Sequence, residues 1–122
     1  MNVPRLILRL SLGINFFLHG LVRLLGNYDE FVKHTVSGFD QTILPSVLAV
    51  PFAFLIPPLE LLLGLALIGD LRPRETLMGL AGLMCLLIAG KCLQQDWSVV
   101  GSQMIYVLCL YLLARESERE IA

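Results

Sequence analysis

The stretch "LILRLSLGINFFLHGLVRLL", residues 6–25, is long and apolar enough to cross a lipid bilayer as a single helix. Crossing the hydrocarbon core takes about 20 predominantly apolar residues. At about 100° per residue, Ser11, Asn15, His19 and Arg23 form one polar stripe along this helix, and the opposite arc is wholly apolar. Because ionisable side chains are costly in a membrane unless they face protein or water, we expect the stripe to face the inside of a helical bundle.

The composition extends this prediction to the whole chain. Of the 122 residues, 57% are hydrophobic and 16% are charged, whereas about a quarter of a soluble domain is charged. The net charge of −1 and the scattered Lys and Arg residues exclude nucleic acid as a partner. The sequence predicts an all-α integral membrane protein, a four-transmembrane-helix bundle forming one domain over residues 1–122. Its predicted helices are residues 6–25, 47–68, 77–93 and 99–114.

The connections between these helices predict an orientation in the membrane. The positive-inside rule favours placing both termini in the cytoplasm, because Arg residues concentrate on one side of the bundle: Arg5, Arg9, Arg72, Arg74, Arg115 and Arg119. The long loop over residues 26–46 then lies outside, and its "YDEFVKHTV" has the apolar spacing of a short interfacial helix. The charged tail "RESEREIA" is expected to be a frayed, solvated helix end. We therefore expect a multi-pass protein of a bacterial or archaeal cytoplasmic membrane.

Depth in the membrane predicts that polar side chains from three helices converge. At about 1.5 Å per residue, His19 lies past the bilayer centre and Arg23 lies near the outer interface. Lys91 on the third helix and Gln103 on the fourth reach the same level. The sequence thus predicts a polar cluster in the outer third of the bundle. Phe16 and Asn15 lie beside or on the first polar stripe, and Tyr106 follows Gln103 on one face of its helix.

Glu60 adds a carboxylate at mid-depth on the second helix, just after Pro57 and Pro58. Two prolines remove two backbone donors, so the helix is expected to bend or break there. A structural interpretation pairs Glu60 with His19 or an arginine to fix helix register, or leaves it protonated. A functional interpretation has Glu60 and His19 exchanging protons with a bound redox molecule.

No metal site is predicted from the cysteines or histidines. Cys85, Cys92 and Cys109 lie in apolar segments without a C-x-x-C pair, which favours small buried thiols, although a redox role of Cys85 and Cys92 on one helical face stays open. Haem is disfavoured because His19 has no second intramembrane histidine, since His34 falls in the predicted loop. The third helix also presents one face of small residues expected to pack against a neighbouring helix: Gly82, Cys85, Ala89 and Cys92.

Two stretches resemble the DoxX family of small four-helix, redox-associated membrane proteins. In "LRLSLGINFFLHGLVRLLG" the matching positions are Arg9, Leu12 with Gly13, Phe16, His19 with Gly20, and Arg23. "PPLELLLGLALIGDLRPRE" is similar to the family's second helix through Glu60, Gly64 and Gly69. The resemblance to the membrane subunits of thiosulfate:quinone oxidoreductase implies a quinone-linked role near the outer face of the membrane.

These observations predict a quinone-interacting subunit or partner of an oxidoreductase. Its catalytic residues would be His19 and Glu60, and its quinone-binding residues would be Asn15, Phe16, Arg23, Lys91, Gln103 and Tyr106. The sequence has no motif of an electron carrier, so electrons would come from a membrane or periplasmic redox protein, or the chain acts as a homo-oligomer. Whether the chain is itself an enzyme stays open. The alternatives are a non-enzymatic assembly or partner protein with a structural polar cluster and, last, a small transporter.

Overall fold

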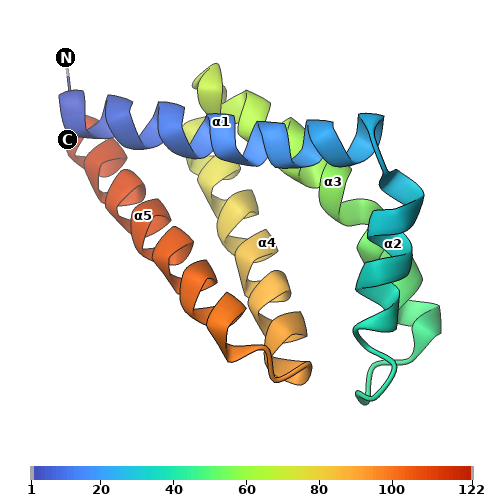
Figure 1. Cartoon of the computed structure of the whole chain (residues 1–122). Helices are drawn as coiled ribbons and strands as arrows, with labels where there is room; N and C mark the ends of the chain where they lie inside the picture. Colours follow the sequence, from blue (N-terminus) through green and yellow to red (C-terminus); the bar gives the residue numbers. More distant parts are fainter. Residues whose placement is uncertain (1, 122) are drawn as a thin grey trace.

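The computed structural model describes residues 2–121, and Figure 1 shows that they form a bundle of helices. The helices are α1 (Val3–Leu25), α2 (Tyr28–Ser37), α3 (Ser46–Ile68), α4 (Pro73–Leu93) and α5 (Trp97–Ile121). The helices α1, α3, α4 and α5 are long and apolar enough to cross a membrane. This confirms the predicted four-helix membrane bundle, and α2 confirms the predicted short helix between the first two spans.

Two helices are longer in the structure than the sequence predicted. The fourth helix, α4, begins at Pro73 rather than residue 77, since proline suits the first turn of a helix and lacks only a donor that would be unpaired there. The last helix, α5, runs to Ile121 rather than residue 114. Ser117 is buried and accepts a hydrogen bond from Arg5 Nε at 3.0 Å. The prediction of a frayed, solvated end is therefore wrong for this part of the tail.

Glycines bring the backbones of α1 and α3 into contact. A Cβ atom on Gly20 of α1 would lie 2.4 Å from the carbonyl oxygen of Pro57 on α3. A Cβ atom on Gly64 of α3 would lie 2.4 Å from the backbone nitrogen of Phe17 on α1. Gly13 is also crowded, since a Cβ atom added there would lie 3.1 Å from the carbonyl oxygen of Gly64. Gly13, Gly20 and Gly64 therefore allow α1 and α3 to approach closely.

The prolines of α3 do not break the helix, so of the predicted bend or break, the break is wrong. Pro57 and Pro58 lie inside one continuous helix. Pro58 cannot donate to the carbonyl oxygen of Phe54 four residues earlier. That oxygen instead accepts a hydrogen bond from the hydroxyl of Tyr28 on α2. Freed carbonyls are tolerated at membrane depth when protein groups bond them, and α2 supplies such a group.

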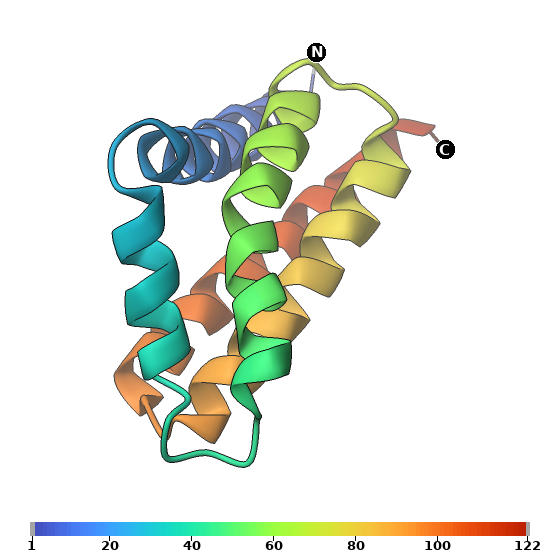
Figure 2. The same ribbon diagram turned by 90° about the vertical axis from the view of Figure 1, so that its right-hand side faces the viewer.

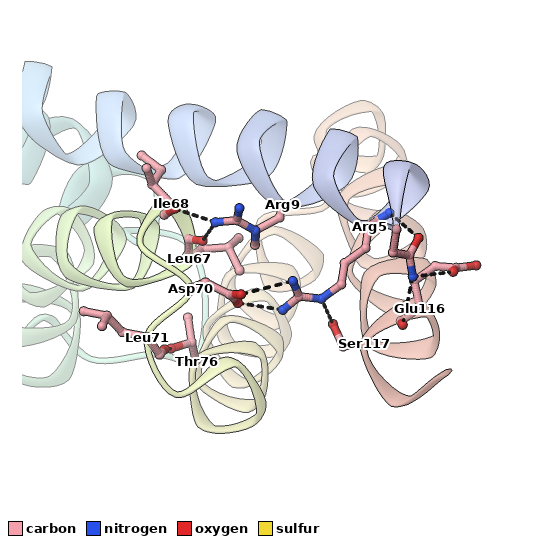
Figure 3. A network of polar contacts seen from close by, with 10 residues as sticks. Arg5, Arg9, Leu67, Ile68, Asp70, Leu71, Thr76, Glu116 and Ser117 are labelled. Carbon is pink, nitrogen blue, oxygen red and sulfur yellow. Dashed lines mark hydrogen bonds and ion pairs between the residues drawn. The ribbon is translucent and has the colours of Figure 1, made fainter. Parts of the chain in front are cut away.

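Arginines of α1 tie three helices together at one end of the bundle, which we call the closed end (Figure 3). Arg5 donates two hydrogen bonds to Asp70, at 2.6 and 3.1 Å, in the turn after α3. Arg9 donates to the carbonyl oxygens of Leu67 and Ile68 at the end of α3. The last carbonyls of a helix have no partner within the helix and carry partial negative charge, which a guanidinium satisfies. The termini and the α3–α4 turn therefore lie at the same end.

The Arg5–Asp70 pair predicts an acid-sensitive part of the stability. The hydrogen bonds from Arg5 lower the pKa of the Asp70 carboxyl below its usual value. Because the folded pKa lies below the unfolded one, the pair stabilises the fold above about pH 4, and this contribution is lost as the pH falls further. Since Asp70 is 39% exposed, we expect Asp70→Asn to lower the unfolding temperature by only roughly 3 °C at pH 7.

Thermal unfolding at pH 7 and pH 3 measures this effect. Asn tolerates the positive φ of 55° at position 70 as Asp does, so the substitution adds no backbone strain. The exposed Asp40 provides the control variant Asp40→Asn. The difference between wild type and Asp70→Asn should shrink at pH 3, and an equal difference at both pH values would contradict the assignment.

The helices separate toward the opposite end, which we call the open end. Figure 1 shows α1 and α5 close together at the chain termini and diverging from there. The short helix α2 leaves the far end of α1 and packs along α3, as Figure 2 shows from the side. The buried core near the closed end holds α1, α3, α4 and α5 together through Leu12, Leu67, Leu80, Leu110 and Leu113. The sequence predicts that the open end is the outer one.

The face of small residues on α4 does not pack within the chain, contrary to prediction. Gly82, Cys85 and Ala89 are exposed, and a Cβ atom on Gly82 would meet nothing within 4 Å. The helix α4 packs with its other face, through Leu80, Leu83 and Met84. Cys85 is therefore not a buried thiol, whereas Cys92 and Cys109 are partly buried, and all three are free.

Candidate functional site

A cavity of about 600 Å³ lies at the open end and is lined by all five helices. The structure brings together the eight residues that the sequence singled out, from α1, α3, α4 and α5. They are Asn15, Phe16, His19, Arg23, Glu60, Lys91, Gln103 and Tyr106. His19, Arg23, Lys91 and Gln103, which were predicted to converge, line this one cavity, while the roles assigned to all eight residues stay predictions.

A hydrogen bond between α1 and α5 forms the floor of the cavity, on the side of the closed end. Asn15 Nδ2 donates to the hydroxyl oxygen of Tyr106 at 3.1 Å. The ring of Tyr106 also packs against Phe16, with 5.9 Å between ring centroids. Because the tyrosine oxygen accepts from Asn15, its own O–H remains available as a donor. Asn15 and Phe16 of α1 and Tyr106 of α5 therefore close the cavity at its floor.

His19 is held by its own helix in one tautomer. Its Nδ1 atom lies 2.8 Å from the carbonyl oxygen of Asn15. A carbonyl oxygen can only accept, so Nδ1 carries the hydrogen and Nε2 of the neutral ring carries a free lone pair. His19 therefore brings a hydrogen-bond acceptor, and a proton acceptor, to the cavity wall.

Glu60 pairs with Arg23 rather than with His19. Arg23 Nη1 donates to Glu60 Oε2 at 3.1 Å, and the Glu60 residue is only 5% exposed. The Arg23 guanidinium also lies 4.3 Å from the ring centroid of Phe31, a cation–π contact from α2. The sequence left His19 or an arginine as possible partners of Glu60, and in the structure the partner is Arg23. This ion pair joins α1 to α3 on one wall.

Lys91 is paired on the opposite side of the cavity. Its ammonium donates to Gln94 Oε1 at 3.2 Å and lies 3.7 Å from Asp96 Oδ2. Both partners follow the end of α4, and both also line the cavity. The positive charges of Arg23 and Lys91 are thus each matched by a carboxylate within the chain.

Gln103 presents a buried oxygen that has no partner among the described residues. Its Oε1 atom is inaccessible to solvent and accepts no hydrogen bond from residues 2–121. An unpaired buried acceptor costs about 1–3 kcal/mol. Because water cannot reach this oxygen, Gln103 lines the cavity with its other atoms.

Sequence reasoning missed the wall that α2 contributes. Phe31, His34, Thr35 and Gly38 line the cavity at the i, i+3, i+4, i+7 spacing of one helical face. This spacing within "YDEFVKHTV" and the following residues was the available signal. His34 lies between the first two spans, as predicted, but α2 brings it to the same cavity as His19. The remaining residues that were missed include Phe39, Phe52, Gln94 and Asp96.

No cluster of metal-ligating side chains occurs in the part of the chain that the structure describes. Among residues 2–119, no three His, Cys, Asp or Glu side chains group so that they could hold a metal ion. The cavity is instead lined by aromatic rings and by polar groups that are mostly paired, which suits an organic ligand.

The family of the chain follows from its first 98 residues. Residues 1–98 match the family model described as methylamine utilisation protein MauE. The chain belongs to the MauE family. The match covers α1 to α4 and reaches the first residues of α5. No curated protein and no solved structure matches the chain.

Membership of the MauE family corrects the prediction of a DoxX protein, which was wrong. The quoted motifs are short, and close packing of any two membrane helices favours glycines at the same helical spacing. The four apolar helices and the MauE match together identify a multi-pass protein of the bacterial cytoplasmic membrane, as predicted.

Proposed function

We propose that this MauE-family protein is a membrane accessory protein of a system that oxidises methylamine, and that its open-end cavity binds a quinone. The observation that carries the proposal is the cavity itself. It has a volume of about 600 Å³, within the range of small-molecule sites. It is lined both by aromatic side chains and by ionisable side chains of the membrane-spanning helices. The family description names methylamine utilisation, and the use of an amine carbon requires an acceptor for its electrons.

The residues present suit a quinone ring. Phe16 and Phe52 give apolar walls, while the O–H of Tyr106 can donate to a ring oxygen. His19 Nε2 can take up or release a proton while its Nδ1–H stays bonded to Asn15. Glu60 is the second group proposed to carry protons, and Arg23 and Lys91 stabilise negative charge near the ligand. A quinone, when bound, would supply two-electron redox chemistry.

Electrons would reach such a site from a partner, either a membrane or periplasmic redox protein or another copy of the chain. This makes the protein an accessory component rather than a complete oxidoreductase. The cavity at the open end would then face the side on which such a partner delivers electrons. The positive-inside pattern favours the outer side of the membrane for this end.

Removal of His19 tests the proposal. We expect His19→Ala to slow methylamine-dependent quinone reduction in native membranes by roughly 100-fold, the usual contribution of a positioned proton-transfer group. Glu60→Gln should slow it as well, and the lipid-facing Met104→Leu on α5 provides the control. The measurement combines the initial reduction rate with the quinone content of the gently extracted complex. Protein without quinone, together with unchanged rates in both variants, would overturn the proposal.

A second candidate function is a non-enzymatic assembly or partner protein. The two ion pairs favour it, because Arg23–Glu60 and Lys91–Asp96 are complete within the chain, as in a cluster that only holds helices together. Native mass spectrometry of the extracted complex distinguishes the two functions. A stable partner subunit without bound quinone would support assembly, and bound quinone would support the cavity as a ligand site.

A further inference from the structure

The hydrogen bond at the floor of the cavity sets the direction of the Tyr106 hydroxyl. Asn15 Nδ2 donates to the tyrosine oxygen at 3.1 Å, and both side chains line the cavity and are partly exposed. A tyrosine hydroxyl has a single hydrogen, which rotates to suit its neighbours. Because an N–H of Asn15 points at the oxygen, the hydroxyl hydrogen must turn away from Asn15.

The hydrogen of this hydroxyl has no acceptor in the part of the chain that the structure describes. The bond from Asn15 is the only hydrogen bond of the Tyr106 side chain among residues 2–119. The ring itself is held in place, since it packs against Phe16. The charged donors of the cavity are engaged, because Arg23 bonds Glu60 and Lys91 bonds Gln94. The Tyr106 O–H is therefore an oriented donor that remains available to a ligand.

On the basis of the proposed quinone site, we propose that Asn15 is a positioning residue that directs the Tyr106 O–H toward a carbonyl oxygen of the bound quinone. A quinone carbonyl oxygen can accept a hydrogen bond and has no hydrogen to donate. It is therefore recognised only by a hydroxyl whose hydrogen is turned toward the ligand. Asn15 acts through Tyr106 and does not itself need to touch the reacting atoms.

Aspartate at position 15 would reverse this hydrogen bond while keeping the size of the side chain. An ionised carboxylate can only accept, so the Tyr106 O–H would turn toward it and leave the quinone without its donor. The backbone carbonyl of residue 15, which lies 2.8 Å from His19 Nδ1, is unchanged by the substitution. Asn15→Asp therefore alters the direction of the tyrosine hydroxyl and leaves the hydrogen bond that fixes His19 in place.

Infrared spectroscopy and equilibrium binding of a decyl-tailed 1,4-benzoquinone with isotope-labelled carbonyl groups test the inference, using the full chain in quinone-free lipid nanodiscs. At about pH 9 the introduced carboxyl is ionised and His19 is neutral in every variant. A hydrogen bond to a carbonyl oxygen lowers its stretching frequency, so wild-type protein should show one lowered carbonyl band. Asn15→Asp and Tyr106→Phe should each lose the lowered band and bind the quinone about ten-fold more weakly.

The double variant separates an indirect role of Asn15 from an independent one. If Asn15 acts only through the hydroxyl, Asn15→Asp/Tyr106→Phe should bind no more weakly than Tyr106→Phe alone. Asn27→Asp is the matched control, because it makes the same chemical change at an exposed residue outside the cavity. If Asn15→Asp does not fold, Asn15→Leu takes its place. Without the amide the hydroxyl turns freely, so lowered and unlowered forms of the same carbonyl band should then appear together.

Three results would overturn the inference and leave quinone binding intact. They are a wild-type protein that binds the quinone without a lowered band, a lowered band unchanged in any of the single variants at position 15 or 106, and losses that multiply to about 100-fold in the double variant. If wild-type protein binds no quinone, the proposed function fails together with the inference.

Discussion

Replacing Gly20 or Gly64 by alanine is expected to destabilise the bundle by about 3 kcal/mol or more. The added Cβ atom would lie 2.4 Å from a backbone atom of the facing helix in each case. Overpacking usually costs 1–3 kcal/mol because side chains adjust, but a backbone atom cannot move without separating α1 from α3. The two helices that carry Glu60 and Arg23 would then lose their register, so the cavity should lose its ligand as well.

A Gly→Ala substitution at an uncrowded position serves as the control, because there the added methyl group is expected to stabilise the helix. In an exposed helix interior, Gly→Ala normally stabilises by about 1 kcal/mol. Gly82 of α4 offers this case, because its added Cβ atom would meet nothing within 4 Å. Unfolding free energies in mixed micelles should fall for Gly20→Ala and Gly64→Ala and stay level or rise for Gly82→Ala. A similar effect at all three positions would show that α1 and α3 do not pack through these glycines.

The polar stripe of the first helix shows why much of the site could be predicted from the sequence. Helical period fixes which residues share a face, and the cost of burying charge in a membrane fixes that this face points inward. Rise per residue then gives depth, so Asn15, His19 and Arg23 could be matched with Lys91 and Gln103 on other helices. All five line the cavity.

The contribution of α2 could not be reached in the same way. A short amphipathic helix between two spans carries no depth marker, so the sequence does not say whether it lies on the membrane or folds back over the bundle. The structure settles this through Tyr28, which bonds the Phe54 carbonyl freed by Pro58. The position of α2 therefore depends on two segments whose structures are each ambiguous from sequence, so the sequence did not place His34 at the cavity.

The choice of partner for Glu60 needed three-dimensional packing as well. His19 and Arg23 lie on the same stripe of α1, one turn apart. Which of them meets Glu60 depends on the exact register of α1 against α3, and that register is set by the contacts of Gly13, Gly20 and Gly64. Period and depth alone leave an uncertainty of about one turn, which equals the separation of the two candidates.

Breaking the Arg23–Glu60 pair is the second change with a large expected effect. Arg23→Leu leaves a carboxylate that is 5% exposed without its partner, and loss of one member of a buried ion pair costs about 3–5 kcal/mol. Glu60→Leu should cost less, because the Arg23 side chain is 31% exposed and keeps its contact with Phe31. The double variant Arg23→Leu/Glu60→Leu should recover most of the stability, since no unpaired charge remains.

Comparing stability with function in this double-mutant cycle separates the two interpretations of Glu60. Unfolding free energies in mixed micelles give the coupling energy of the pair. Methylamine-dependent quinone reduction in membranes gives its functional importance. If Glu60 carries protons, the double variant should be stable but at least about 100-fold slower than wild type. A double variant with normal stability and a normal rate would assign the pair to helix packing alone, because both charges would then be dispensable to the redox step.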